Sequence, residues 1–94
     1  MLLITVSHSD SQTLVVGLLN ACRQRTTAVS IFFTGQGVNM LNNDRVLAAL
    51  ACARESIACA ESWSDWSEAG CPVTEGSQTD HSRLIGQATH LVGF

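Results

Sequence analysis

The sequence predicts an α/β fold in which one small domain, residues 1–94, contains a mostly parallel sheet of four to five strands with helices on both faces. Short, continuously apolar runs recur at 2–6, 28–33 and 57–60, as in strands that are covered on both faces of a parallel sheet. Segments with the apolar spacing of amphipathic helices lie between these runs. Such alternation requires right-handed crossovers and a parallel sheet. A chain of 94 residues supports a single hydrophobic core.

The first element is a strand from Leu2 to Val6, and a helix follows it. Ser9 and Gln12 have the spacing of a capping box, which predicts that this helix starts beside them. The apolar positions that recur at helical spacing are Val15, Leu18, Leu19 and Cys22. This helix therefore covers the sheet with that face.

The second strand, 28–33, leads directly into the segment 34–38, which contains Gly35 and Gly37. Paired glycines after a strand indicate a tight turn and a close approach of the backbone to a neighbour. The segment is either an ordinary turn or a loop that lines a substrate pocket. It lacks the third glycine of a dinucleotide-binding fingerprint.

The rest of the chain adds a helix, a strand, a polar segment, a helix and a strand. Asn42 or Asn43 caps the second helix. The third strand ends at Cys59, and we expect residues 62–78 to form an irregular loop. A last helix starts near Thr79 or Asp80, with Leu84, Ile85 and Ala88 facing inward, and a strand over 90–94 closes the chain.

Composition limits the possible partners and compartments. Only 14% of the residues are charged, the net charge is −3, and all five cations are arginines, which argues against a nucleic-acid partner. Large uncharged surfaces favour a homo- or hetero-oligomer. The first ten residues have no basic segment and too short an apolar run for a signal peptide or a membrane span. We therefore expect a cytoplasmic protein with no membrane association and with reduced thiols.

The main functional clue is Cys59, at the carboxyl end of a predicted central strand. Open α/β sheets bind their ligands at this edge, so the thiol can meet a substrate there. Catalysis needs a thiolate near neutral pH, which an adjacent cation favours and the acidic residue Glu61 opposes. His8, at the end of a neighbouring strand, and Arg45 are the candidate cations. The alternative is a small buried cysteine that completes the strand.

The other cysteines have different expected roles. Cys71 lies in the polar segment beside Pro72 and is either a second acceptor thiol or an ordinary loop residue. Cys22 belongs to the predicted core, and Cys52 lies on a helix flank. No CxxC or HxxxH spacing occurs, so the sequence predicts neither a metal site nor another cofactor.

Two tryptophans, Trp63 and Trp66, stand in the otherwise polar segment after Cys59. Tryptophan is enriched at interface hot spots, which favours a contact surface with another subunit. The alternative is that one or both rings cover the edge of the sheet.

Three segments together resemble the DsrE/DsrF/DsrH superfamily, which includes the Tus proteins of a sulfur relay to tRNA. They are Phe32 to Val38, read FFTGQGV, the strand that ends at Cys59, and Asp80 to Phe94. The resemblance implies a DsrE-like fold and a strand-end cysteine that accepts sulfur as a persulfide. The length is closest to the DsrH/TusB branch, whose members act as partner subunits, whereas the cysteine placement is similar to the DsrE/TusD branch.

Two functions from different classes follow. The first is a cytoplasmic sulfur carrier with sulfurtransferase-like chemistry, in which Cys59 takes sulfane sulfur from a donor protein and passes it to a partner thiol. The second is a non-catalytic assembly subunit of a DsrEFH- or TusBCD-like complex, with Cys59 structural. A nucleotide or cofactor site at 34–38 is a third, weaker hypothesis.

Overall fold

The computed structural model describes all 94 residues and contains one sheet of five parallel strands. The strands are β1 (Leu2–Val6), β2 (Val29–Phe33), β3 (Ser56–Cys59), β4 (Thr74–Gly76) and β5 (His90–Gly93). Their order across the sheet is β4-β3-β2-β1-β5. The predicted α/β class and the parallel sheet are therefore confirmed.

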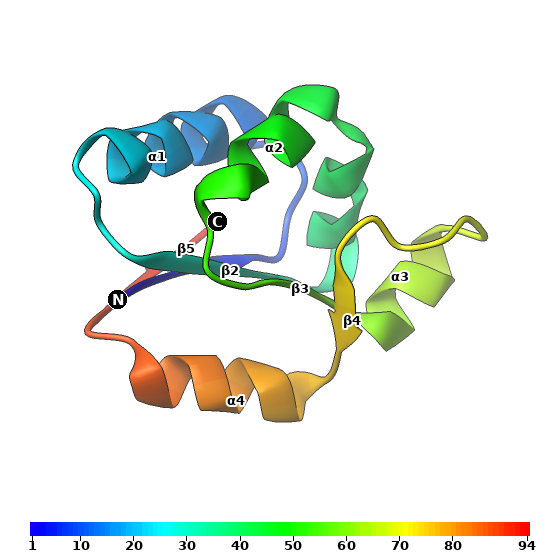
Figure 1. The fold of residues 1–94 in the computed structure, drawn as a ribbon. Coiled ribbons are helices and arrows are strands. Elements are labelled where there is room, and N and C mark those ends of the chain that lie inside the picture. The colour runs from blue at the N-terminus through cyan, green and yellow to red at the C-terminus, as the bar shows by residue number, and fades with distance from the viewer.

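Helices cover both faces of the sheet (Figure 1). On one face lie α1 (Gln12–Gln24), α2 (Asp44–Ala49) and two 3₁₀ segments, η1 (Gly35–Asn42) and η2 (Leu50–Cys52). The helix α4 (Gln78–Gln87) lies on the other face, and the short α3 (Ala60–Trp66) projects from the end of the sheet. None of these helices combines the length and apolar character needed to cross a bilayer.

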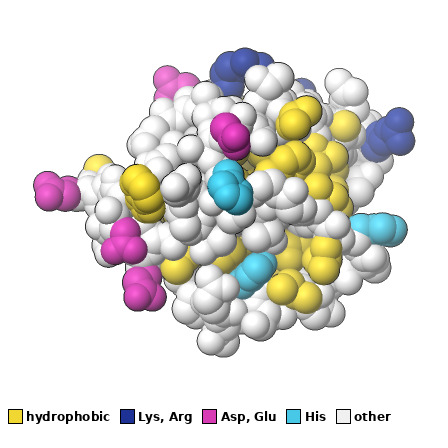
Figure 2. All heavy atoms as spheres, turned by 180° about the vertical axis from the view of Figure 1, so that it is seen from behind, with side chains coloured by type: hydrophobic (Ala, Val, Ile, Leu, Met, Phe, Trp, Pro, Cys, Tyr) yellow, Lys and Arg dark blue, Asp and Glu magenta, His cyan; other side chains and the backbone are white.

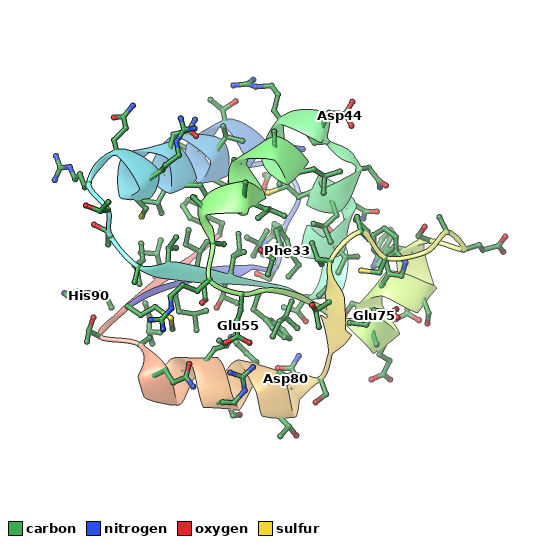
Figure 3. All side chains as sticks on the ribbon, viewed as in Figure 1. Phe33, Asp44, Glu55, Glu75, Asp80 and His90 are labelled. Atoms are coloured by element: carbon green, nitrogen blue, oxygen red, sulfur yellow. The ribbon has the colours of Figure 1, made fainter.

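The two faces of the sheet have separate hydrophobic layers, because successive side chains of a strand point to opposite faces. The larger layer, under α1 and α2, contains Ile4, Val6, Ile31, Phe33 and Ala58 among its residues. Figure 3 shows Phe33 in this layer, and Glu55 with Asp80 on the side of α4. The buried residues of the second layer, under α4, are Leu3, Phe32, Ile57, Cys59 and Leu84.

The segment after Cys59 is more ordered than expected, because it contains both α3 and β4. The expectation of a continuous loop over 62–78 is wrong for a tertiary reason. Trp63 is only 5% exposed, packs into the larger layer, and donates its indole N–H to the carbonyl oxygen of Ala69 at 2.7 Å. One aromatic side chain thus holds this polar segment against the core.

Helix boundaries and facing differ from the prediction in three places. The first helix is preceded by Ser11 with no side-chain cap, so the proposed capping box of Ser9 and Gln12 does not form. The last helix starts slightly earlier than expected, after a capping box made by Ser77 and Asp80. Ile85, expected to face inward, is 42% exposed, whereas Leu84 is buried in the layer beneath α4 and Ala88 packs against it. Asn43 caps α2 through its side-chain oxygen, which settles the choice between the two asparagines.

Candidate functional site

The candidate site is the carboxyl edge of the sheet around Cys59. This residue ends β3 and directly precedes α3. Its side chain lies on the α4 face of the sheet, in one layer with Phe32 and Ile57, and is 7% exposed. The sulfur is therefore at the predicted edge, under a nearly complete apolar cover.

Polar groups of the first turn of α3 determine the acidity of this thiol. Burial raises the pKa of Cys59, and the charge of Glu61 acts in the same direction. The Ser62 hydroxyl and the backbone amides of Ser62 and Glu61 stabilise the thiolate and outweigh both effects. The net result is a pKa below the ordinary value of a cysteine. The neutral thiol itself forms no capping hydrogen bond to α3.

Ser62 connects Cys59 to the glycine segment that follows β2. The backbone N–H of Gly35 donates to Ser62 Oγ at 2.9 Å, so the hydroxyl proton of Ser62 remains free to be donated to the Cys59 sulfur. Gly35 adopts a φ of 54°, a conformation that suits glycine. The predicted pocket residue Gly35 thus lies one hydrogen bond away from a group that acts on Cys59.

Gly37 has a packing role in the same segment. A Cβ atom at this position would overlap the carbonyl group of Val6, so the close backbone approach predicted from the glycine pair is present. The Gly37 amide donates to the Thr34 carbonyl oxygen, and that of Gly35 is occupied by Ser62. These two amides are therefore satisfied within the protein.

A hydrogen-bonded chain from α4 closes the edge on the side where Cys59 lies. The His81 ring stacks on Phe32, with centroids 4.5 Å apart. Its Nδ1 lies 3.3 Å from Gln78 Oε1, its Nε2 lies 3.0 Å from Thr5 Oγ1, and Gln78 Nε2 donates to Thr34 Oγ1. Burial lowers the pKa of His81, which favours a neutral ring. Because Gln78 Oε1 can only accept, Nδ1 carries the proton and Nε2 accepts from the Thr5 hydroxyl. This chain connects α4 with the ends of β1 and β2.

Sequence reasoning did not single out Ser62, Gln78 or His81. A signal existed only for Ser62, which would fall in the first turn of any helix that started after Cys59. His81 and Gln78 lie 22 and 19 residues beyond Cys59 in the sequence, and only the crossover through β4 returns them to this edge.

The two cations proposed to act on Cys59 lie elsewhere. His8 has its Nδ1 3.2 Å from the hydroxyl of its neighbour Ser7 and is exposed. Arg45 lines a groove between α1 and α2, on the opposite face of the sheet from Cys59. The pKa of the Cys59 thiol is lowered by polar groups of α3 and not by either of these cations.

The other three thiols are free and separate from Cys59. Cys71 is half-buried against the larger layer, and burial raises its pKa despite a hydrogen bond from the Val73 amide. Cys22 is buried in that layer, as predicted. Cys52 lies on a partly covered flank, where its Sγ donates to the carbonyl oxygens of Ala49 and Leu19. No three histidine, cysteine or acidic side chains are grouped as metal ligands would be.

The two tryptophans have different environments. Trp63 belongs to the core, whereas Trp66 is 51% exposed at the end of α3. Of the pair, Trp66 is therefore the ring that another subunit can contact.

We expect the pH dependence of alkylation to separate Cys59 from Cys71. Because the pKa of Cys59 is lowered and that of Cys71 is raised, the midpoint of the labelling rate against pH should be lower for Cys59. Iodoacetamide labelling over a pH series, read by peptide mass, gives both midpoints. Midpoints are compared because Cys59 is more covered, which slows its labelling at every pH.

Ser62→Ala is the informative variant for this prediction, and Ser64→Ala, on the exposed side of α3, is its control. The first should raise the Cys59 midpoint and the second should leave it unchanged. A Cys59 midpoint at or above that of Cys71 in the unmodified protein would contradict the role of Ser62.

No family model, curated protein or solved structure matches the chain. Its function is therefore inferred from its own residues, above all from Cys59 and the groups around it.

Proposed function

We propose that the protein is a cytoplasmic sulfur carrier in which Cys59 holds the transferred sulfur as a persulfide. The observation that carries this proposal is a thiol at the carboxyl edge of β3 whose pKa is lowered by neighbouring polar groups. The first turn of α3 supplies those groups without a charged side chain, and the Gly35 amide donates to one of them, the Ser62 hydroxyl. The resemblance to the DsrE/Tus superfamily supports the same role for a strand-end cysteine.

The reaction is a thiolate exchange without net oxidation. The Cys59 thiolate attacks the terminal sulfur of a donor persulfide, R–S–SH, and forms a new S–S bond. The donor S–S bond breaks, and its electron pair leaves with the donor thiolate, R–S⁻. In the second half, a thiolate of the acceptor attacks the terminal sulfur and Cys59 leaves as a thiolate. Ser62 stabilises the Cys59 thiolate both as nucleophile and as leaving group.

The cover over Cys59 restricts the donors that fit. With 7% of the residue exposed, only a donor that presents its terminal sulfur on a narrow tip can reach the thiol. The proposed partners are a donor and an acceptor protein with such a cysteine, and related subunits in a homo- or hetero-oligomer.

A second candidate function is a non-catalytic subunit of such an assembly. The burial of Cys59 favours it, because the side chain completes the apolar layer with Phe32, Ile57 and Leu84. A cysteine is often found in such a position for packing alone. In this case the thiol would never carry sulfur.

Sulfur loading distinguishes the two functions. The protein is incubated with a sulfane-sulfur donor, and its intact mass is measured before and after reductant. A carrier should gain the mass of one sulfur atom, lose it on reduction, and show it on the Cys59 peptide.

Cys59→Ser should abolish loading, whereas Cys71→Ser is a matched control that should load as the unmodified protein does. Because the lowered pKa depends on Ser62, Ser62→Ala should slow loading most at pH 6 to 7. If Cys59→Ser loaded normally, or if Cys71 carried as much sulfur as Cys59, the sulfur-carrier function of Cys59 would be contradicted. The non-catalytic assembly subunit would then be the remaining function.

A further inference from the structure

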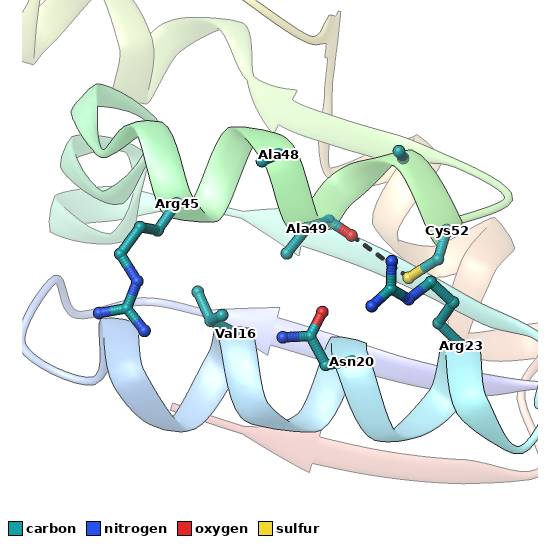
Figure 4. Close-up of a pocket in the computed structure, with 8 residues that line it drawn as sticks. Val16, Asn20, Arg23, Arg45, Ala48, Ala49 and Cys52 are labelled. Atoms are coloured by element: carbon teal, nitrogen blue, oxygen red, sulfur yellow. Dashed lines mark hydrogen bonds between the residues drawn. The ribbon is translucent and has the colours of Figure 1, made fainter.

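A groove runs between α1 and α2 on the face of the sheet opposite Cys59, with a volume of about 300 Å³. Small apolar side chains, Val16, Ala48 and Ala49, form its middle part. Figure 4 shows that Arg45 and Arg23 extend from the two helices at opposite ends of the groove. The groove is therefore cationic at both ends, and its middle combines these apolar side chains with the amide of Asn20.

The two guanidinium groups have no anionic partner within the protein. The salt bridges of the structure involve only Arg83, which pairs with Glu55 and lies near Asp80 on the α4 side. Arg23 and Arg45 are both exposed. A guanidinium presents a planar set of donors that fits carboxylates, so each end of the groove is suited to a carboxylate.

The chain also carries a surface of the opposite character. Residues 55–80 contain six acidic residues and no cation, whereas residues 1–54 contain four arginines and two acidic residues. Figure 2 shows acidic side chains gathered on the end of the molecule from which α3 projects. Four of the six, Glu61, Asp65, Glu68 and Glu75, belong to α3, β4 and the segment between them, whereas Glu55 and Asp80 lie near Arg83.

The α3 end combines these charges with an exposed aromatic ring. Glu61 and Asp65 are four residues apart and therefore lie on the same side of α3. Trp66 follows directly and is 51% exposed. An exposed tryptophan beside carboxylates is the usual composition of an interface anchor, and arginine adds a favourable contact with its ring.

We propose that α3 of one copy docks into the α1–α2 groove of a second copy, with Trp66 over the alanine floor and the α3 carboxylates on Arg23 and Arg45. Both halves of the contact are present on every copy, which favours a second copy over a different protein. A single small anion reaches only one end of the groove, whereas α3 offers two carboxylates, Glu61 and Asp65, and an exposed aromatic ring.

The contact joins two different surfaces, so it is heterologous. Each copy has a free groove and a free α3 after one contact forms, and assembly continues to a ring or an open filament. The proposed contact does not require sulfur transfer at Cys59.

Two variants that each lose one half of the contact test the proposal by light scattering coupled to gel filtration. The groove variant is Arg23→Glu/Arg45→Glu, and the α3 variant is Glu61→Gln/Trp66→Ala. The unmodified protein should be larger than its subunit mass of 10.0 kDa at micromolar concentration. Each variant alone should be a monomer, with a dissociation constant at least about 100-fold higher. The groove variant places like charges in contact, and the α3 variant loses a carboxylate and its exposed aromatic ring.

The mixture of the two variants gives the decisive result. One variant keeps a working groove and the other a working α3, so an equimolar mixture should form a heterodimer and nothing larger. An isologous contact elsewhere would leave both variants oligomeric. Circular dichroism of each variant shows that it is folded.

Arg25→Glu/Arg54→Glu is the matched control, because it makes the same charge change at two arginines outside the groove. It should assemble as the unmodified protein does. Assembly should also weaken as salt is raised from 50 to 500 mM, since exposed ion pairs are screened. A monomeric unmodified protein, or a mixture that stays monomeric, would overturn the proposal.

Discussion

Trp63→Ala should lower the free energy of unfolding by about 3–5 kcal/mol, the range measured for truncation of a large buried aromatic. Trp63 is 5% exposed and packs into the layer under α1 and α2, so its removal leaves a cavity. The Ala69 carbonyl also loses its indole donor. Domains of this size are stable by only about 5–15 kcal/mol, so the variant should be marginally folded. Urea unfolding followed by circular dichroism measures the change.

Two further variants divide this effect into its parts. Trp63→Phe retains most of the ring and loses the hydrogen bond to Ala69, so it should cost about 1–2 kcal/mol. Trp66→Ala, in the same helix but half exposed, should change the stability of the monomer by about 0.5 kcal/mol or less. Equal losses for Trp63→Ala and Trp66→Ala would show that α3 is not held by Trp63.

Gly37→Ala should be nearly as damaging, although it adds one methyl group. The new Cβ would overlap the Val6 carbonyl oxygen and lie 2.6 Å from its carbon, and both atoms belong to the backbone of a central strand. β1 cannot move without breaking its hydrogen bonds with β2 and β5. The Thr34 amide, at the start of η1, donates to the same Val6 carbonyl oxygen. We expect a loss of about 3 kcal/mol, at the upper end of overpacking costs, and urea unfolding again measures it.

Gly17→Ala is the control for this prediction. Gly17 lies within α1, where an added Cβ meets nothing within 4 Å. Because alanine is the better helix former, this variant should be more stable by about 0.5–1 kcal/mol. If both glycine variants were equally destabilised, the close approach of Gly37 to Val6 would not be the cause.

The sequence alone determined the fold class and most of the elements. The apolar run Leu2 to Val6 coincides with β1, and the second run contains β2, because a strand covered on both faces has to be apolar throughout. The buried Cys22 was likewise accessible from local pattern, which left the cap of α2 open between Asn42 and Asn43. These features depend on residues near one another in the chain.

Only the tertiary structure decided what surrounds Cys59. Periodicity placed the thiol at the end of a strand, and it could not show that the Gly35 amide orients Ser62 or that His81 stacks on Phe32. The proposed cation Arg45 proved to lie across the sheet, because α2 covers the other face. Contacts between segments far apart in the sequence depend on which face of the sheet each crossover helix covers.

The segment after Cys59 shows the same division. Its polar composition predicts a loop, and local pattern contains no sign that Trp63 enters the core while Trp66 stays outside. That difference arises because α3 turns one side toward η1 and the larger layer, which fixes the segment and leaves its acidic side free. The sequence determined which residues were available for a site, and the packing of α3 and α4 against the sheet decided which of them meet.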